Sequence, residues 1–305
     1  MIVAEVVRSG FVESVHHGSV VVHAVDRTMV AGDVTDPIFP RSSNKPLQTV
    51  GMLRAGLTVR DGARLALISG SHWGEPFHLR MVREILADAG LDAGALRCPA
   101  ALPLSEAERD AWLRSGGGPE PVLMNCSGKH AGMLATCVAN GWPVDSYLDP
   151  KHPLQVGLAG AVADLADEPV AATGVDGCGA PVFAISLTGL ARAFRRLVEA
   201  APGTPERRVA DEMRVRPELV AGTGADDTLL MRAVPGLLAK GGAEGVLAVA
   251  VPGAGSVALK IGDGAMRART PVLLSALRKL GVEVPAMEEP VLGGAAPVGV
   301  VRSVW

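Results

Sequence analysis

Aromatic residues make up only 3% of this 305-residue chain, so its core must consist mainly of Val, Leu, Ala and Ile. No run of five or more basic residues occurs and the formal net charge is −3, which argues against a nucleic-acid partner. No apolar run reaches about 18 residues, so we expect no membrane-spanning helix. The first residues, "MIVAEVVRSGFVES", lack a basic segment followed by a long apolar run, so no secretory signal is expected.

Cysteine is also scarce. The four cysteines are widely spaced and form no C-x-x-C pair; they are Cys98, Cys126, Cys137 and Cys178. This usage predicts reduced thiols in a cytoplasmic protein rather than a disulfide framework.

The overall composition, with 48% hydrophobic and 20% charged residues, is typical of a folded globular protein. Val-rich segments between Gly or charged turns predict strands in the first 32 residues and again near the C-terminus. Helical patterns fill the middle. We therefore expect an α/β (α+β) fold, in which one antiparallel sheet built from both termini is covered by helices. Residues 1–305 read as a single unit, in which roughly 77–170 could form a helical lobe.

The segment "FPRSSNKPLQ" places Lys45 three positions after Ser42, where a helix over residues 43–55 should begin. A serine hydroxyl becomes a good nucleophile only when a base removes its proton, and a neutral lysine amine can be that base. Free N–H groups at a helix start would suit a developing oxyanion. From spacing alone, the ordinary interpretation is a capped helix start with a solvated lysine.

Two further segments carry thiols. "NCSGKHAG" contains Cys126 at a helix start, and "GVDGCGAP" contains Cys178 in a tight glycine turn. The two cysteines could be soft metal ligands, with Lys129 or His130 as the third. Spacing alone favours the alternative, two buried thiols that behave as small apolar side chains.

The loop "SGSHWGEP", residues 69–76, is dense in the residue types that line sites, although a simple turn before a helix explains it equally well. In "SVALKIGDG", Lys260 alternates out of an apolar strand face. It could serve a second serine or simply face water.

The order of these motifs is more specific than any one of them. "FVESVHHG", "FPRSSNKPLQ", "SHWGEPFH", "NCSGKHAGML", "DGCGAP", "MRVRPELVAGTG", "KGGAEGV" and "ALKIGDGAMRA" follow one another from about residue 5 to 270. In this order the chain resembles the bacterial L-asparaginase II family, the Rhizobium-type or class 3 asparaginases.

The resemblance implies hydrolysis of L-asparagine to L-aspartate and ammonia, on a fold similar to serine β-lactamases and glutaminases. It also implies a cytoplasmic homodimer. By motif position the two catalytic Ser–Lys pairs of the family would be Ser42 with Lys45 and Ser71 with Lys260. Our hypothesis for the reaction is attack by Ser42 with Lys45 as base and with the second pair assisting.

The family also carries a zinc ion held by two cysteines and a lysine, which implies the ligand set Cys126, Lys129 and Cys178. Further residues inside the same motifs are expected to bind substrate or support the site: Arg41, His72, Asn125, His130 and Asp176.

One segment departs from the family pattern. Relatives usually carry an Arg and an aromatic residue where this chain has Ala225 and Asp226, in "GTGADDT". Two alternative functions stay open: a glutaminase, β-lactamase or peptidase with the same acyl-serine chemistry, and a catalytically dead relative that binds an amino acid or zinc. The retained serines and lysines favour an enzyme.

Overall fold

A computed structural model describes all residues from 1 to 305. Its main feature is an eight-stranded antiparallel sheet with the order β10-β11-β1-β2-β9-β8-β7, in which β3 pairs additionally with β2. The strands are β1 (Ile2–Arg8), β2 (Phe11–Ala24), β3 (Thr28–Ala31), β7 (Leu238–Gly241), β8 (Val246–Val251), β9 (Gly255–Ile261), β10 (Glu289–Gly293) and β11 (Ala296–Ser303).

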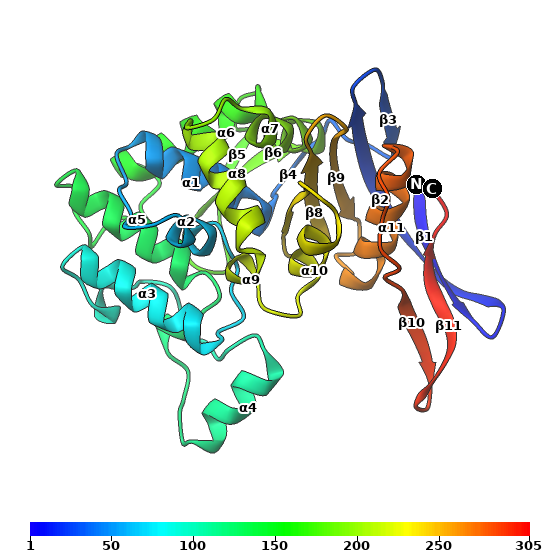
Figure 1. The fold of residues 1–305 in the computed structure, drawn as a ribbon, viewed down its shortest axis with the longest axis horizontal. Helices are drawn as coiled ribbons and strands as arrows, with labels where there is room; N and C mark the ends of the chain where they lie inside the picture. Colours follow the sequence, from blue (N-terminus) through cyan, green and yellow to red (C-terminus); the bar gives the residue numbers. More distant parts are fainter.

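The sheet is built from both ends of the chain, as the sequence predicted. β1 and β11 lie side by side, and the two termini meet next to them (Figure 1). β8 and β9 pair as an antiparallel hairpin in the C-terminal part, where the sequence predicted strands. No helix in the chain is long and apolar enough to cross a membrane.

Helices surround this sheet and fill the centre of the chain. They are α1 (Lys45–Arg54), α2 (Ala63–Ile68), α3 (Pro76–Asp88), α4 (Glu106–Arg114), α5 (Ser127–Ala139), α6 (Pro153–Ala166), α7 (Leu187–Glu199), α8 (Pro205–Val215), α9 (Pro217–Val220), α10 (Asp226–Ala233) and α11 (Arg269–Lys279). Short 3-10 turns are η1 (Arg41–Asn44), η2 (Ala93–Ala95), η3 (Pro121–Leu123) and η4 (Met266–Ala268).

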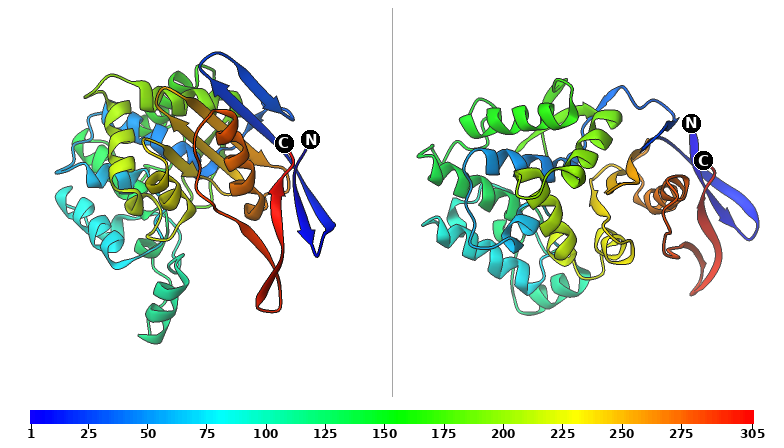
Figure 2. Two further views of the ribbon diagram at one scale, coloured as in Figure 1. Left: turned by 45° about the vertical axis from the view of Figure 1, so that its right-hand side comes forward. Right: turned by 45° about the horizontal axis from the view of Figure 1, so that its top comes forward.

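The strands nearest the centre are apolar on both faces because helices cover both. Every residue of β8 is buried, which explains its uninterrupted sequence "VLAVAV". α7 packs on β8 and β9, and α11 packs on β9 and β11. The helices α1, α2, α3, α5 and α6 gather on the left in Figure 1, and α4 projects below them. The right-hand view of Figure 2 shows the same separation of the helical part from the strands of the two termini.

Two details differ from the sequence prediction. A second sheet of three strands, β4 (Pro37–Ile38), β6 (Pro181–Ser186) and β5 (Ala172–Val175), lies among the helices. The sequence does not predict this sheet because β4 and β5 have only two and four residues, and β6 is buried throughout and so lacks a polar alternation. The Val-rich segments on either side of Gly18, which the sequence predicted as strands, form one 14-residue strand, β2. Glycine at position 18 lets β2 continue alongside β9, because a Cβ there would come within 2.6 Å of the Lys260 carbonyl oxygen.

The turn η1 joins the helical part to the β7 edge of the large sheet. Ser43 is buried and its Oγ donates a hydrogen bond of 2.8 Å to the Lys240 carbonyl oxygen. Beside Ser43, the backbone at Gly242 lies so close to the backbone of Pro40 that a Cβ on Gly242 would collide with the Pro40 carbonyl oxygen. Only glycine therefore allows η1 to lie against the end of β7.

We expect Gly242→Ala to lower the free energy of unfolding by about 1–3 kcal/mol, since the added methyl group forces η1 away from β7. The matched control is Gly157→Ala, at an exposed position within α6 where a Cβ meets no atom. That substitution should raise stability by about 0.5–1 kcal/mol through helix propensity. Urea unfolding measures both, and equal stability of the two variants would contradict the close approach at Gly242.

Candidate active site

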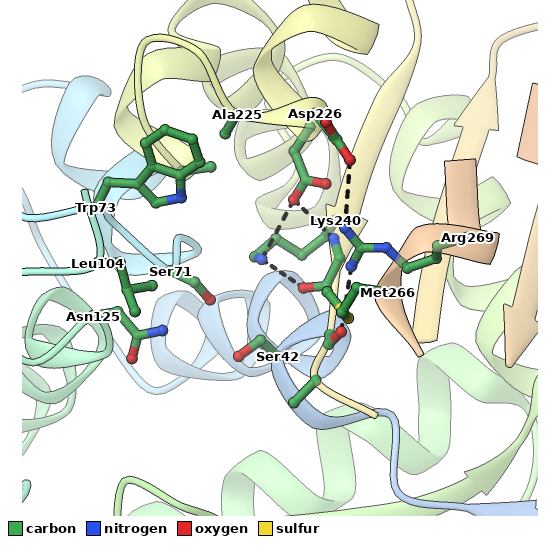
Figure 3. Close-up of a pocket in the computed structure, with 15 residues that line it drawn as sticks. Ser42, Ser71, Trp73, Leu104, Asn125, Ala225, Asp226, Lys240, Met266 and Arg269 are labelled. Carbon is green, nitrogen blue, oxygen red and sulfur yellow. Dashed lines mark hydrogen bonds and ion pairs between the residues drawn. The ribbon is translucent and has the colours of Figure 1, made fainter. Parts of the chain in front are cut away.

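A cavity of about 430 Å³ lies between the helical part and the β7 edge of the large sheet. Figure 3 shows its two walls: Trp73, Leu104 and Asn125 on one side, and Lys240 and Arg269 on the other. Its size is within the range of small-molecule sites, roughly 300–1,000 Å³.

Ser42 reaches this cavity from η1, directly before α1 begins at Lys45. Its hydroxyl points into the cavity (Figure 3). The preceding residue, Arg41, has a φ of 54°, a left-handed conformation that costs about 1–3 kcal/mol in a residue other than glycine. Such strain is tolerated only where surrounding contacts impose it, here the Ser43 bond to β7 and the bond from Asn44 Nδ2 to the Phe183 carbonyl.

Ser71 is the second hydroxyl in the cavity, and it contacts a lysine directly. Its backbone N–H bonds to the Val220 carbonyl oxygen at 2.7 Å, which fixes the loop after α2. Lys45 is only 1% exposed, and its Nζ lies 2.8 Å from Ser71 Oγ and 2.5 Å from the Gly70 carbonyl oxygen. The lysine that the sequence paired with Ser42 therefore donates to Ser71 instead, and Ser42 and Ser71 both line the cavity.

The predicted partnership of Ser71 with Lys260 is not formed. Lys260 Nζ donates instead to the Glu244 carbonyl oxygen at 2.8 Å, and its side chain does not line the cavity. The strand order explains this correction, because β9 lies two strands away from β7, the strand that borders the cavity.

The lysine that does face the serines across the cavity is Lys240 on β7, which sequence reasoning gave no role (Figure 3). Its Nζ lies 3.6 Å from Asp227 Oδ2 and donates to the Gly241 carbonyl oxygen at 2.7 Å. Asp227 also accepts a bond of 2.8 Å from the Gly241 N–H. The available signal was the motif "KGGAEGV", whose lysine is Lys240.

Burial lowers the pKa of Lys240 to about 8, although the Asp227 carboxylate opposes the shift. Near neutral pH this amine is therefore mostly charged, and it loses its charge when the pH rises above 8. Lys45 and Arg269 add to the lowering, because nearby positive charges disfavour another one.

The five residues predicted to bind substrate fall into three positions. Asn125 lines the cavity. Arg41 donates from Nε to Asp176 Oδ1 at 2.8 Å, and this ion pair lies outside the cavity lining. His72 and His130 are fully buried: His72 Nε2 lies 2.8 Å from Ser127 Oγ, and His130 Nδ1 lies 2.7 Å from the Tyr147 hydroxyl. Burial holds the pKa of both imidazoles below its usual value.

The three predicted zinc ligands lie together in the interior. Cys126, Lys129 and Cys178 are each at most 4% exposed, and Lys129 Nζ lies 3.2 Å from Cys178 Sγ. A hydrogen bond from the Cys126 thiol holds the pKa of Cys178 far below its usual value, with help from Lys129. No group of three histidine, cysteine or carboxylate side chains could hold a metal ion, so a site here depends on Lys129 as third ligand. Two cysteine thiolates are common zinc ligands, and Lys129 would complete the set only as the neutral amine.

Ala225 and Asp226, where the chain departs from its family pattern, both line the cavity (Figure 3). Asp226 is the first residue of α10 and accepts a hydrogen bond of 3.1 Å from Thr270 Oγ1 on α11.

One serine hydroxyl bonds to a buried lysine amine and a second serine hydroxyl lines the same cavity, an arrangement suited to an amidohydrolase. The sequence model of one family, L-asparaginase II, matches residues 4–299. The chain therefore belongs to the L-asparaginase II family, which confirms the family predicted from the motif order.

No curated protein matches the chain in sequence. Solved structures that match the chain include Mglu in its native form, at 14% sequence identity, with 86% of this chain and 63% of that chain covered and a TM-score of 0.45. A β-lactamase from Mycobacterium bovis matches at 13% identity and a TM-score of 0.38, with 86% of this chain and 94% of that chain covered. A Bacillus glutaminase matches at 12% identity and a TM-score of 0.39, with 88% of this chain and 92% of that chain covered. The chain thus spans less than two thirds of Mglu.

The contact between Lys240 and Asp227 gives a testable pKa. We expect Asp227→Asn to move the pKa of Lys240 from about 8 to a lower value, because the carboxylate is the group that stabilises the ammonium form. Lysine ¹³Cε NMR titration measures it. In the control, Asp263→Asn, the pKa of Lys240 should stay in place, since Asp263 acts on Lys260. An unchanged pKa in Asp227→Asn would rule out the ion pair.

Proposed function

We propose that the chain is an L-asparaginase, which hydrolyses L-asparagine to L-aspartate and ammonia through an acyl-serine intermediate. The observation that carries the proposal is the pair of hydroxyls, Ser42 and Ser71, at one cavity, with the Lys45 amine 2.8 Å from Ser71 Oγ. Membership of the L-asparaginase II family supports the substrate.

In the first step Ser42 Oγ attacks the side-chain amide carbon of asparagine, and the C–O bond forms. The Ser42 hydroxyl faces the cavity and precedes a helix start, where backbone N–H groups can stabilise the oxyanion. Its proton passes through Ser71 to Lys45, which accepts it as the free amine. The C–N bond then breaks, and the proton leaves with ammonia.

In the second step water attacks the ester, the bond to Ser42 breaks, and aspartate is released. The same Ser71–Lys45 contact takes the proton of water and returns one to Ser42 Oγ. Because Lys45 bonds directly to Ser71, Ser71 relays the proton between Ser42 and Lys45 in this scheme. The expected pairing of Ser71 with Lys260 has no part in it.

The cavity wall that carries Lys240 and Arg269 faces the part of asparagine that carries the α-carboxylate in this proposal. Lys240 and Arg269 provide positive charge for the α-carboxylate, and the Asn125 side chain adds polar hydrogen-bonding capacity across from them. Lys240 is charged near neutral pH, as this role requires.

We extend the proposal to zinc, held by Cys126, Lys129 and Cys178, with Lys129 as the neutral amine. When bound, the ion would supply positive charge that orients substrate and the buried motifs around it. The family resemblance further supports a cytoplasmic homodimer, in which residues 1–305 act as one asparaginase unit and roughly 77–170 belong to its helical lobe.

We expect Ser42→Ala to reduce ammonia release from asparagine by roughly a thousandfold or more, because Ser42 carries the acyl group in this scheme and Ser71 only relays protons. Ser43→Ala is the matched control at the next position. It should remain active and lose about 1 kcal/mol of stability with its bond to Lys240.

Mass mapping of acid-quenched enzyme locates the acyl group, and an adduct on Ser71 would overturn Ser42 as nucleophile. Glutamine and small peptides, assayed beside asparagine, separate an asparaginase from the other acyl-serine hydrolases. Asparagine binding without any ammonia release would instead indicate a catalytically dead relative.

The zinc proposal predicts that the purified chain contains metal and that Cys178→Ala loses at least tenfold in zinc affinity. The control is Cys137→Ala, which removes a buried thiol of α5 outside the ligand set. Elemental analysis and chelator competition measure affinity without an activity assay. Equal zinc binding by both variants would remove Cys178 from the site.

A further inference from the structure

Four charged side chains line the cavity, and three of them are engaged by the protein. Asp227 and Lys240 pair with each other and are buried. Arg269 donates from Nη1 to the Gly242 and Val246 carbonyl oxygens, and its side chain is 9% exposed. The fourth, Asp226, is different because its side chain is 49% exposed.

The Asp226 carboxylate keeps most of its hydrogen-bonding capacity free. Its one hydrogen bond comes from Thr270 Oγ1, and the nearest cationic atom, Arg269 Nη2, lies 3.9 Å away. An ionised carboxylate accepts about four hydrogen bonds, so the cavity-facing lone pairs are available to a ligand with N–H donors.

The position of Asp226 relative to the serines is equally informative. Figure 3 shows Asp226 across the cavity from Ser42, on the wall that also carries Lys240 and Arg269. This wall therefore presents both a negative and a positive charge to a molecule whose amide carbon lies at Ser42. An amino acid with a free α-ammonium and α-carboxylate matches that arrangement.

We propose that Asp226 binds the α-ammonium group of the substrate, so that the site selects amides of free amino acids over the same amides without an amine. This inference rests on the proposed asparaginase function and names its substrate-selecting residue. The ammonium group donates to the exposed Asp226 carboxylate, and the charge-assisted bond forms only with substrates that carry the amine.

A purely structural role for Asp226 makes a different prediction. A carboxylate in the first turn of α10 favours the helix, and its bond to Thr270 ties α10 to α11. In that case a substitution lowers stability and affects all substrates equally. The two roles are therefore separated by substrate preference rather than by loss of activity.

The test compares L-asparagine with succinamic acid, which has the same amide and carboxylate but no α-amine. Asp226→Asn keeps the size of the side chain and an acceptor for Thr270 while it removes the charge. We expect kcat/KM for asparagine to fall roughly 10- to 100-fold, the range for a hydrogen bond to a charged group. For succinamic acid it should stay the same or rise, because a repulsive charge is lost.

Glu289→Gln is the matched control. Glu289 is near enough that, together with burial, Asp226 raises its pKa, yet it does not line the cavity. This variant removes an equal charge nearby and should leave the preference for asparagine unchanged. An unchanged preference in Asp226→Asn, with active wild-type chain, overturns the inference and leaves the proposed function standing.

Calorimetry keeps the two proposals distinguishable when no ammonia is released. The chain with Ser42→Ala is titrated with asparagine and with succinamic acid, with and without Asp226→Asn. Tighter binding of asparagine that is lost with Asp226→Asn supports the inference even where turnover is absent. Equal binding of the two compounds, or binding of neither, overturns it.

Discussion

A buried lysine amine has to find hydrogen-bond partners inside the protein, and Lys45 finds them in the loop after α2. Its Nζ bonds to the Gly70 carbonyl oxygen and to Ser71 Oγ, while its backbone begins α1 three residues after Ser42. One side chain thereby brings together two segments that each carry a serine. The cavity exists in its present form because these segments meet the β7 edge, where Ser43 bonds to Lys240.

The second wall depends on a balance of charges. Lys240 can be buried because Asp227 lies beside it, and Asp227 can be buried because Lys240, Arg269 and the Gly241 N–H stabilise its charge. This pairing leaves Asp226 as the exposed carboxylate of the cavity. The cavity of this L-asparaginase II family member thus combines two serine hydroxyls, Ser42 and Ser71, with a charged wall from the sheet and its neighbouring helices.

Much of the fold was predictable because its signals are local. Val-rich runs predicted the strands of both termini, and β1 and β11 are among them. The sheet of β4, β5 and β6 was not predictable, since a two-residue strand carries no periodicity. The continuity of β2 depended on the close approach at Gly18, a contact between segments more than 200 residues apart.

The sequence by itself determined which chemical groups this protein has and that they follow the motif order of one family. It also placed Ser42, Lys45, Cys126 and Cys178 at helix starts or turns, because caps and glycine turns are encoded locally. Only the tertiary structure decided which groups meet. Lys45 contacts Ser71, Lys240 in place of Lys260 borders the cavity, and Asp226 faces it. Strand order and loop anchoring set these distances, and both depend on contacts between residues remote in the sequence.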